Sequence, residues 1–252
     1  MGASLRIGRV FGIPIEINIS WAFVFLLLTV VLAQEFGQAH LGWPVAQRWL
    51  VAMAMVVLFF LSVLAHELSH SLLARHEGIP VRGITLFIFG GVSLLTREPD
   101  RPLTEFKVAA VGPLTSIVLA AVFGSVWYLL NPGDSIAGVT LFLLAWSNLS
   151  LGVFNILPGY PLDGGRVLRA AVWGLTGNHR RATRVAARAG QTIGALTVFI
   201  GVLLGAFVNV VDGVWVAVIG SFLFSVATAS YRQERSWATA LGRGPVRPGP
   251  EA

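Results

Sequence analysis

Six long apolar runs dominate this sequence and constrain its fold more than any other feature. A helix needs roughly 20 apolar residues to cross about 30 Å of hydrocarbon. Of the 252 residues, 55% are hydrophobic and only 12% are charged, against about 25% charged in typical soluble domains. The expected spans are residues 19–33, 49–74, 106–130, 138–157, 189–208 and 214–230. We therefore expect an all-α, multi-pass protein of the cell membrane with about six transmembrane helices.

The 18 Lys and Arg residues give a net charge of +6, and their distribution predicts the topology. If the amino terminus is cytoplasmic and six spans alternate, every Lys and Arg except Arg48 falls on the cytoplasmic side. This is the positive-inside pattern. The charge is then explained by topology and by attraction to anionic lipid, with no role for nucleic acid. We expect both termini to be cytoplasmic and no cleavable signal peptide at the start.

Two segments outside the spans have the alternating pattern of strands. In the first 18 residues, Ile13, Ile15 and Ile17 alternate with other residue types, which predicts a short cytoplasmic strand. Residues 81–95 are rich in β-branched and aromatic side chains, and Gly90-Gly91 interrupts them. This segment is too short to span and too apolar for a solvated loop, so we expect a small β-hairpin that re-enters the membrane from the cytoplasmic side. The alternative is an interfacial loop that only packs against the core.

The second span ends in a His-Glu-x-x-His pattern formed by His66, Glu67 and His70. Two histidines four residues apart share one helix face, where both imidazoles can bind one zinc ion. A carboxylate beside the first ligand can take a proton from an attacking water and return it to a leaving amine. The pattern also occurs by chance on solvated helices. Here, however, it lies within an apolar run, where ionisable groups are costly and usually functional.

A catalytic zinc site needs three protein ligands and one open position, and the chain contains no cysteine. The remaining histidines are poor candidates, because His40 is external, His76 lies past the span and His179 is in a basic loop. Asp163 is the best candidate, since it follows a helix that Pro158 and Pro161 interrupt on the same side of the membrane. The alternative for Asp163-Gly164 is a tight turn without a metal.

Polar residues also gather near the end of the fourth span. Asn148 and Asn155 are seven residues apart and therefore share a helix face. They are candidates for binding substrate or a developing oxyanion.

Two motifs together resemble the site-2 protease family of intramembrane zinc metalloproteases. The first is His66-Glu67-Leu68-Ser69-His70, and the second is Asn155-x-x-Pro158-x-x-Pro161-Leu162-Asp163-Gly164-Gly165. The resemblance runs from about residue 11 to residue 171. It implies that His66, His70 and Asp163 bind one zinc ion per chain, that Glu67 is the general base and acid, and that Asn155 helps to hold substrate or oxyanion. Ser116 departs from the family, since many members carry asparagine there. PDZ and CBS domains found in many relatives are expected to be absent.

The resemblance implies proteolysis of transmembrane protein substrates within the bilayer. His66 lies nine residues before Arg75, or about 13 Å at 1.5 Å per residue, so the active site would lie in the cytoplasmic half of the membrane. The hairpin at residues 81–95 could offer an edge strand to an extended substrate through Gly90, Gly91 and Val92. The domains expected are a strand segment (1–18), a six-span protease domain (19–230, catalytic core about 49–170) and a disordered cytoplasmic tail (231–252).

Two other function classes remain open from the residues alone. Ionisable groups and interrupted helices at membrane depth also occur in ion or zinc transporters. A catalytically inactive relative that only binds membrane segments is the third possibility, although Glu67 and all three expected ligands are present. The sequence does not name the substrate or the oligomeric state.

Overall fold

The computed structural model describes residues 4–40 and 42–242. The chain divides into two compact units, and the boundary in the sequence lies between Ile156 and Leu157. The first unit contains β1 (Ser4–Val10), β2 (Ile13–Asn18), α1 (Ile19–Ala39), α2 (Val45–His76), β3 (Val81–Phe87), β4 (Gly90–Leu95), α3 (Pro102–Leu130) and α4 (Ile136–Ile156). The second unit contains α5 (Asp163–Thr176), α6 (His179–Phe207) and α7 (Val210–Gly242).

Six of these helices are long and apolar enough to cross a membrane, namely α1, α2, α3, α4, α6 and α7. They overlap the six runs read from the sequence, but several extend beyond the expected bounds. For example, α2 begins at Val45 rather than at residue 49, and α6 begins at His179 rather than at residue 189. The prediction of a mainly helical, multi-pass membrane protein with a small β-structure is therefore confirmed.

The strands of the first unit form one sheet in the order β1-β2-β3-β4. The predicted hairpin is present, with β3 and β4 antiparallel, and β2 pairs parallel with β3. The sequence alone did not indicate this parallel pairing. The alternating residues Ile13 and Ile15 are buried with Ile84 against Leu64 and Leu68 of α2. The sheet thus lies on α2 beside the His-Glu-x-x-His turn, with β4 as an end strand.

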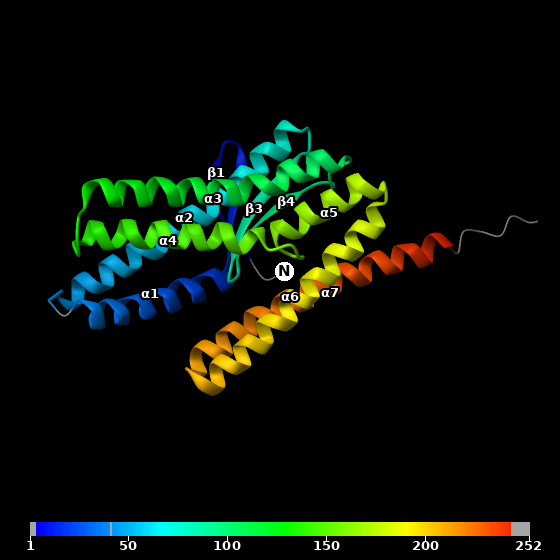
Figure 1. Cartoon of the computed structure of the whole chain (residues 1–252). Coiled ribbons are helices and arrows are strands. Elements are labelled where there is room, and N and C mark those ends of the chain that lie inside the picture. Colours follow the sequence, from blue (N-terminus) through cyan, green and yellow to red (C-terminus); the bar gives the residue numbers. More distant parts are fainter. Residues whose placement is uncertain (1–3, 41, 243–252) are drawn as a thin grey trace, which may run out of the picture. The chain divides into compact units, whose positions relative to one another are not determined.

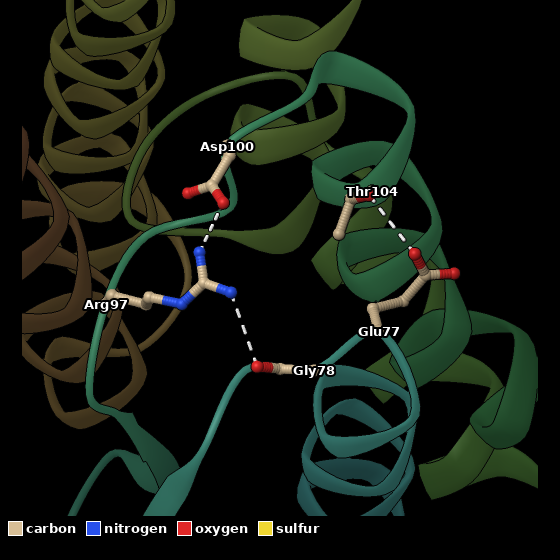
Figure 2. A network of polar contacts seen from close by, with 5 residues as sticks. All are labelled: Glu77, Gly78, Arg97, Asp100 and Thr104. Carbon is tan, nitrogen blue, oxygen red and sulfur yellow. Dashed lines mark hydrogen bonds and ion pairs between the residues drawn. The ribbon is translucent and has the colours of Figure 1, made fainter.

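Polar contacts hold the carboxyl-terminal end of α2, as Figure 2 shows. Arg97, which follows β4, pairs with Asp100 and donates to the carbonyl of Gly78 at 3.3 Å. Glu77 accepts from Thr104 at 3.2 Å (Figure 2) and from Lys107 of α3 at 2.9 Å. These contacts connect the end of α2, the segment after β4 and the start of α3.

The hydrogen bond from Lys107 is the main cause that holds the pKa of Glu77 below its ordinary value. A lowered pKa in the folded state stabilises the fold above the ordinary carboxyl pKa. That contribution is lost as pH falls through the lowered value.

Helices α3 and α4 lie side by side in the first unit (Figure 1). They approach closely at Gly152, where an added Cβ would lie 3.1 Å from the Pro113 carbonyl oxygen and 3.4 Å from Ser116 Cβ. This close approach leaves no room for a larger residue at position 152 and keeps Ser116 of α3 in the buried interior.

In the second unit, α6 and α7 pack side by side through glycines (Figure 1). A Cβ at Gly194 or Gly201 of α6 would lie 2.6 Å from the Phe224 amide or 2.5 Å from the Ala217 amide of α7. Small residues at a helix interface let the two backbones approach this closely.

Two expectations for this unit need correction. The basic residues 180–188 are the first part of α6, so His179 begins a helix and does not lie in a loop as expected. The tail expected to be disordered from residue 231 is helical as far as Gly242, because α7 continues through residues that favour helix. Residues 243–252 lie outside the described part.

Candidate metal centre

His66 and His70 lie one helical turn apart on α2, and both are buried. Their Nε2 atoms are 3.2 Å apart. Two nitrogen ligands that are each 2.0–2.1 Å from a tetrahedral zinc ion lie about 3.3 Å from each other. The spacing of the two Nε2 atoms therefore fits two adjacent ligands of one zinc ion.

The other ring nitrogens of this pair are held by α3. His70 Nδ1 lies 2.5 Å from the carbonyl oxygen of Val108, and His66 Nδ1 lies 2.9 Å from Ser116 Oγ. A carbonyl oxygen only accepts, so His70 must donate from Nδ1, and in the neutral ring Nε2 then carries the lone pair that a metal would bind. Such partners orient ligand histidines in zinc sites. Ser116, where the family resemblance implies asparagine, thus contacts His66 through its hydroxyl.

Gly112 provides the space in which the imidazoles meet. An added Cβ at this position of α3 would overlap His70 Nε2 and would lie 2.7 Å from His66 Nε2. A proline inside a helix, such as Pro113, indicates a kink, whereas the structure gives the preceding glycine a different role. It lets the α3 backbone approach the two nitrogen atoms that would bind the metal.

We expect Gly112→Ala to lower the zinc affinity by at least about 10–100-fold, which is the loss seen when a group that supports a metal ligand is removed. The new methyl group would have to displace an imidazole from its position. Elemental analysis of purified protein measures the effect. Gly124→Ala in the same helix is the matched control, because its Cβ would meet Ala145 Cβ at an ordinary 3.7 Å. Equal zinc contents in the two variants would contradict this role for Gly112.

Glu67 lies between the two histidines in sequence and contacts strand β4. Its Oε2 accepts a hydrogen bond of 2.8 Å from Ser93 Oγ. An added Cβ at Gly91 would lie 2.5 Å from Glu67 Cγ, so the strand backbone lies directly on this side chain. Gly90 begins β4 with a positive φ of 124°, and Val92 is exposed. The structure thus brings the predicted hairpin residues and the predicted general base together.

Asp163 lies in the second unit, where it is the first residue of α5. The preceding residues 157–162 form no regular helix or strand, as the two prolines predicted. The alternative of a tight Asp-Gly turn is wrong, because Gly164 and Gly165 belong to α5. His66, His70 and Asp163 each offer one atom that could bind a metal.

The two asparagines of α4 have different surroundings. Asn148 is fully buried, and its Nδ2 donates to Ser62 Oγ of α2 at 3.0 Å and to the Leu144 carbonyl at 2.8 Å. These contacts favour a role in packing α4 against α2. Asn155 is only partly buried and donates to the Leu151 carbonyl of its own helix at 3.0 Å. Its Oδ1 and the second amide hydrogen are the groups it could offer to a substrate.

Sequence reasoning missed three contributions to this centre: the carbonyl of Val108, the space at Gly112 and the hydroxyl of Ser93. The first two leave no signal in a single sequence, because they depend on how closely α3 approaches α2. Ser93 had a signal. It is a polar residue in an apolar strand and shares a face with Gly91, two positions earlier.

Comparisons with known proteins agree with this geometry. The model of Peptidase family M50 matches residues 54–139 and 132–201, which is more than half of the chain. A candidate zinc metalloprotease of Synechocystis sp. is 40% identical over 92% of this chain and 61% of its own length. The candidate zinc metalloprotease Rip3 of Mycobacterium tuberculosis is 38% identical over 90% of this chain and 58% of its own length. The chain thus spans about three fifths of these two relatives.

A solved structure has the same fold. The site-2 protease from Methanocaldococcus jannaschii matches with a TM-score of 0.65 and 28% sequence identity, covering 91% of this chain and 95% of that one. The resemblance to site-2 proteases noted from the two motifs is therefore confirmed.

Proposed function

The chain belongs to peptidase family M50, and from this premise we propose that it is an intramembrane zinc metalloprotease. Its reaction is the hydrolysis of peptide bonds in or near the transmembrane segments of membrane proteins. The observation that carries the proposal is the His66–His70 pair, with Nε2 atoms 3.2 Å apart on a buried helix turn that also holds Glu67. The family match and the intact Glu67 do not favour a transporter or an inactive binder.

In this proposal, one zinc ion per chain is held by His66, His70 and Asp163. Zinc, when bound, supplies Lewis-acid chemistry that polarises the scissile carbonyl. Glu67 takes a proton from the attacking water and delivers it to the leaving amine, so that the carboxylate is regenerated. The proposal for Asp163 is supported by its motif and by its place at the start of a helix that follows a non-helical segment.

Substrate is proposed to bind in extended form along β4. This strand is at an end of the sheet and lies on Glu67, so a peptide paired with it would pass close to the general base. Substrate helices must unwind locally first, because a peptide bond within a helix is shielded. Asn155 is proposed to donate to substrate or to the developing oxyanion. The charge distribution supports a site toward the cytoplasm, with both ends of the chain on that side.

We expect Val92→Pro to reduce cleavage while zinc content stays unchanged, because proline has no N–H to donate to a paired strand. Each lost hydrogen bond of 0.5–1.5 kcal/mol corresponds to about two- to tenfold in rate. Val92→Ala, the control, should have a much smaller effect. Proline scanning of residues 90–95 should give alternating sensitivity, since only every second N–H faces the substrate and the others face β3. Uniform tolerance along the segment would leave the hairpin with a packing role only.

The activity itself is tested with purified protein reconstituted in liposomes together with single-span peptides that differ in helix-breaking residues. Cleavage within the apolar segment that depends on zinc supports the proposal. Mass spectrometry of partners captured on Glu67→Gln protein in native membranes would then identify the substrate.

A further inference from the structure

Strand β4 makes a direct hydrogen bond to the carboxylate proposed as the general base. Ser93 Oγ lies 2.8 Å from Glu67 Oε2 and 3.0 Å from the backbone carbonyl oxygen of Glu67. Both groups only accept when the carboxylate is ionised, so the serine hydroxyl is the donor. The Ser93 hydroxyl therefore connects β4 to both the side chain and the backbone of Glu67 in α2.

A second serine favours this direction of the hydrogen bond. Ser71 is fully buried, lies one helical turn after Glu67, and donates to Ser93 Oγ at 3.1 Å. A hydroxyl that already accepts one hydrogen bond keeps its own hydrogen for another partner, and such chains strengthen each member. The order Ser71 to Ser93 to Glu67 thus directs the Ser93 hydrogen toward the carboxylate.

The strand also restricts where the carboxylate can move. Gly91 and Ser93 lie on the same face of β4, because side chains alternate along a strand. At Gly91 there is no room for a Cβ beside Glu67 Cγ, and at Ser93 the hydroxyl holds Oε2. One contact fixes the stem of the Glu67 side chain and the other fixes its charged end.

We propose that Ser93 is a positioning residue that orients the Glu67 carboxylate, so that the strand proposed to bind substrate also holds the general base in place. The inference rests on the proposed proteolytic function and deepens it. It predicts that two parts of β4 affect different steps of the reaction. The backbone at Val92 affects substrate binding, whereas the side chain of Ser93 affects the chemical step.

The kinetic test compares Ser93→Ala, Ser93→Thr and Ser71→Ala with wild type. Ser93→Ala should lower kcat about tenfold, the scale of a hydrogen bond to a charged group, with KM and zinc content unchanged. Ser93→Thr keeps the hydroxyl and should restore kcat. Ser71→Ala should lower kcat by a smaller factor. Ser221→Ala is the control, since this exposed serine of α7 bonds only the Ala217 carbonyl at 2.8 Å among the contacts described.

A measurement independent of activity tests the placement of the strand. The sequence has no cysteine, so Glu67→Cys combined with Ser93→Cys introduces a single pair. This pair should cross-link on oxidation, whereas Glu67→Cys with Val92→Cys, on the opposite strand face, should not. Failure of the first pair to cross-link would overturn the inference even if the variants lose activity.

The outcomes separate this inference from the proposed function. If wild-type protein cleaves and Ser93→Ala keeps its kcat, or changes only KM, the role of Ser93 is wrong and the protease assignment stands. If zinc-loaded wild-type protein cleaves no membrane peptide, both are overturned.

Discussion

Glu67→Gln is expected to keep zinc bound and to slow cleavage about 10²- to 10⁴-fold, the usual contribution of a general acid or base. The substitution preserves the shape of the side chain, and the amide oxygen can still accept the hydrogen bond from Ser93. It removes only the capacity to accept a proton from the attacking water. Zinc content and cleavage of a model membrane peptide should be measured on the same preparation.

The control for this prediction is Glu35→Gln, because Glu35 is an exposed acid of α1 outside the proposed machinery. It should keep both zinc and activity. Substantial cleavage by fully metallated Glu67→Gln protein would show that another group moves the proton, and the role proposed for Glu67 would be wrong.

Asp163→Ala is expected to weaken zinc binding and lower the zinc content, because it removes one of three proposed ligands. The loss of affinity should exceed the roughly 10–100-fold that follows removal of a group that only supports a ligand. Cleavage should fall in parallel with the zinc content. Asp134→Ala, which removes an exposed acid between α3 and α4, should change neither. Elemental analysis of the purified variants gives the comparison.

A second substitution separates metal binding from a helix effect at this position. Asp163 begins α5, where a carboxylate also interacts favourably with the helix dipole. Asp163→Asn keeps a polar side chain there but offers a poor zinc ligand, so it should lose zinc as the alanine variant does. If both variants retain full zinc and activity, the third ligand is another residue.

Part of the fold and of the site could be predicted because the chemistry leaves local patterns. His66, Glu67 and His70 are recognisable because a metal pair needs a four-residue spacing on a helix. Six spans could be predicted because a helix that crosses the hydrocarbon core needs a long apolar run. The hairpin could be predicted because backbone N–H and C=O groups at that depth must hydrogen-bond within the protein. Each of these features is contained in a short stretch of the chain.

The rest depends on contacts between distant segments. The pairing of Ile15 with Ile84 joins two strands on either side of two helices, and nothing in either strand specifies the partner. Gly112 resembles any kink-forming glycine until α3 is placed against His70. Helix α7 extends beyond the expected span, because residues that favour helix continue it past residue 230.

The most direct test of the central claim measures cleavage and zinc transport in the same liposomes. Vesicles should contain wild-type or Glu67→Gln protein together with a single-span peptide, with zinc removed by a chelator and then restored. We predict that wild-type protein cuts the peptide within its apolar segment only when zinc is present, that Glu67→Gln protein does not, and that neither moves zinc across the bilayer. Zinc flux through metal-loaded wild-type protein, with every peptide left intact, would contradict the assignment as an intramembrane protease.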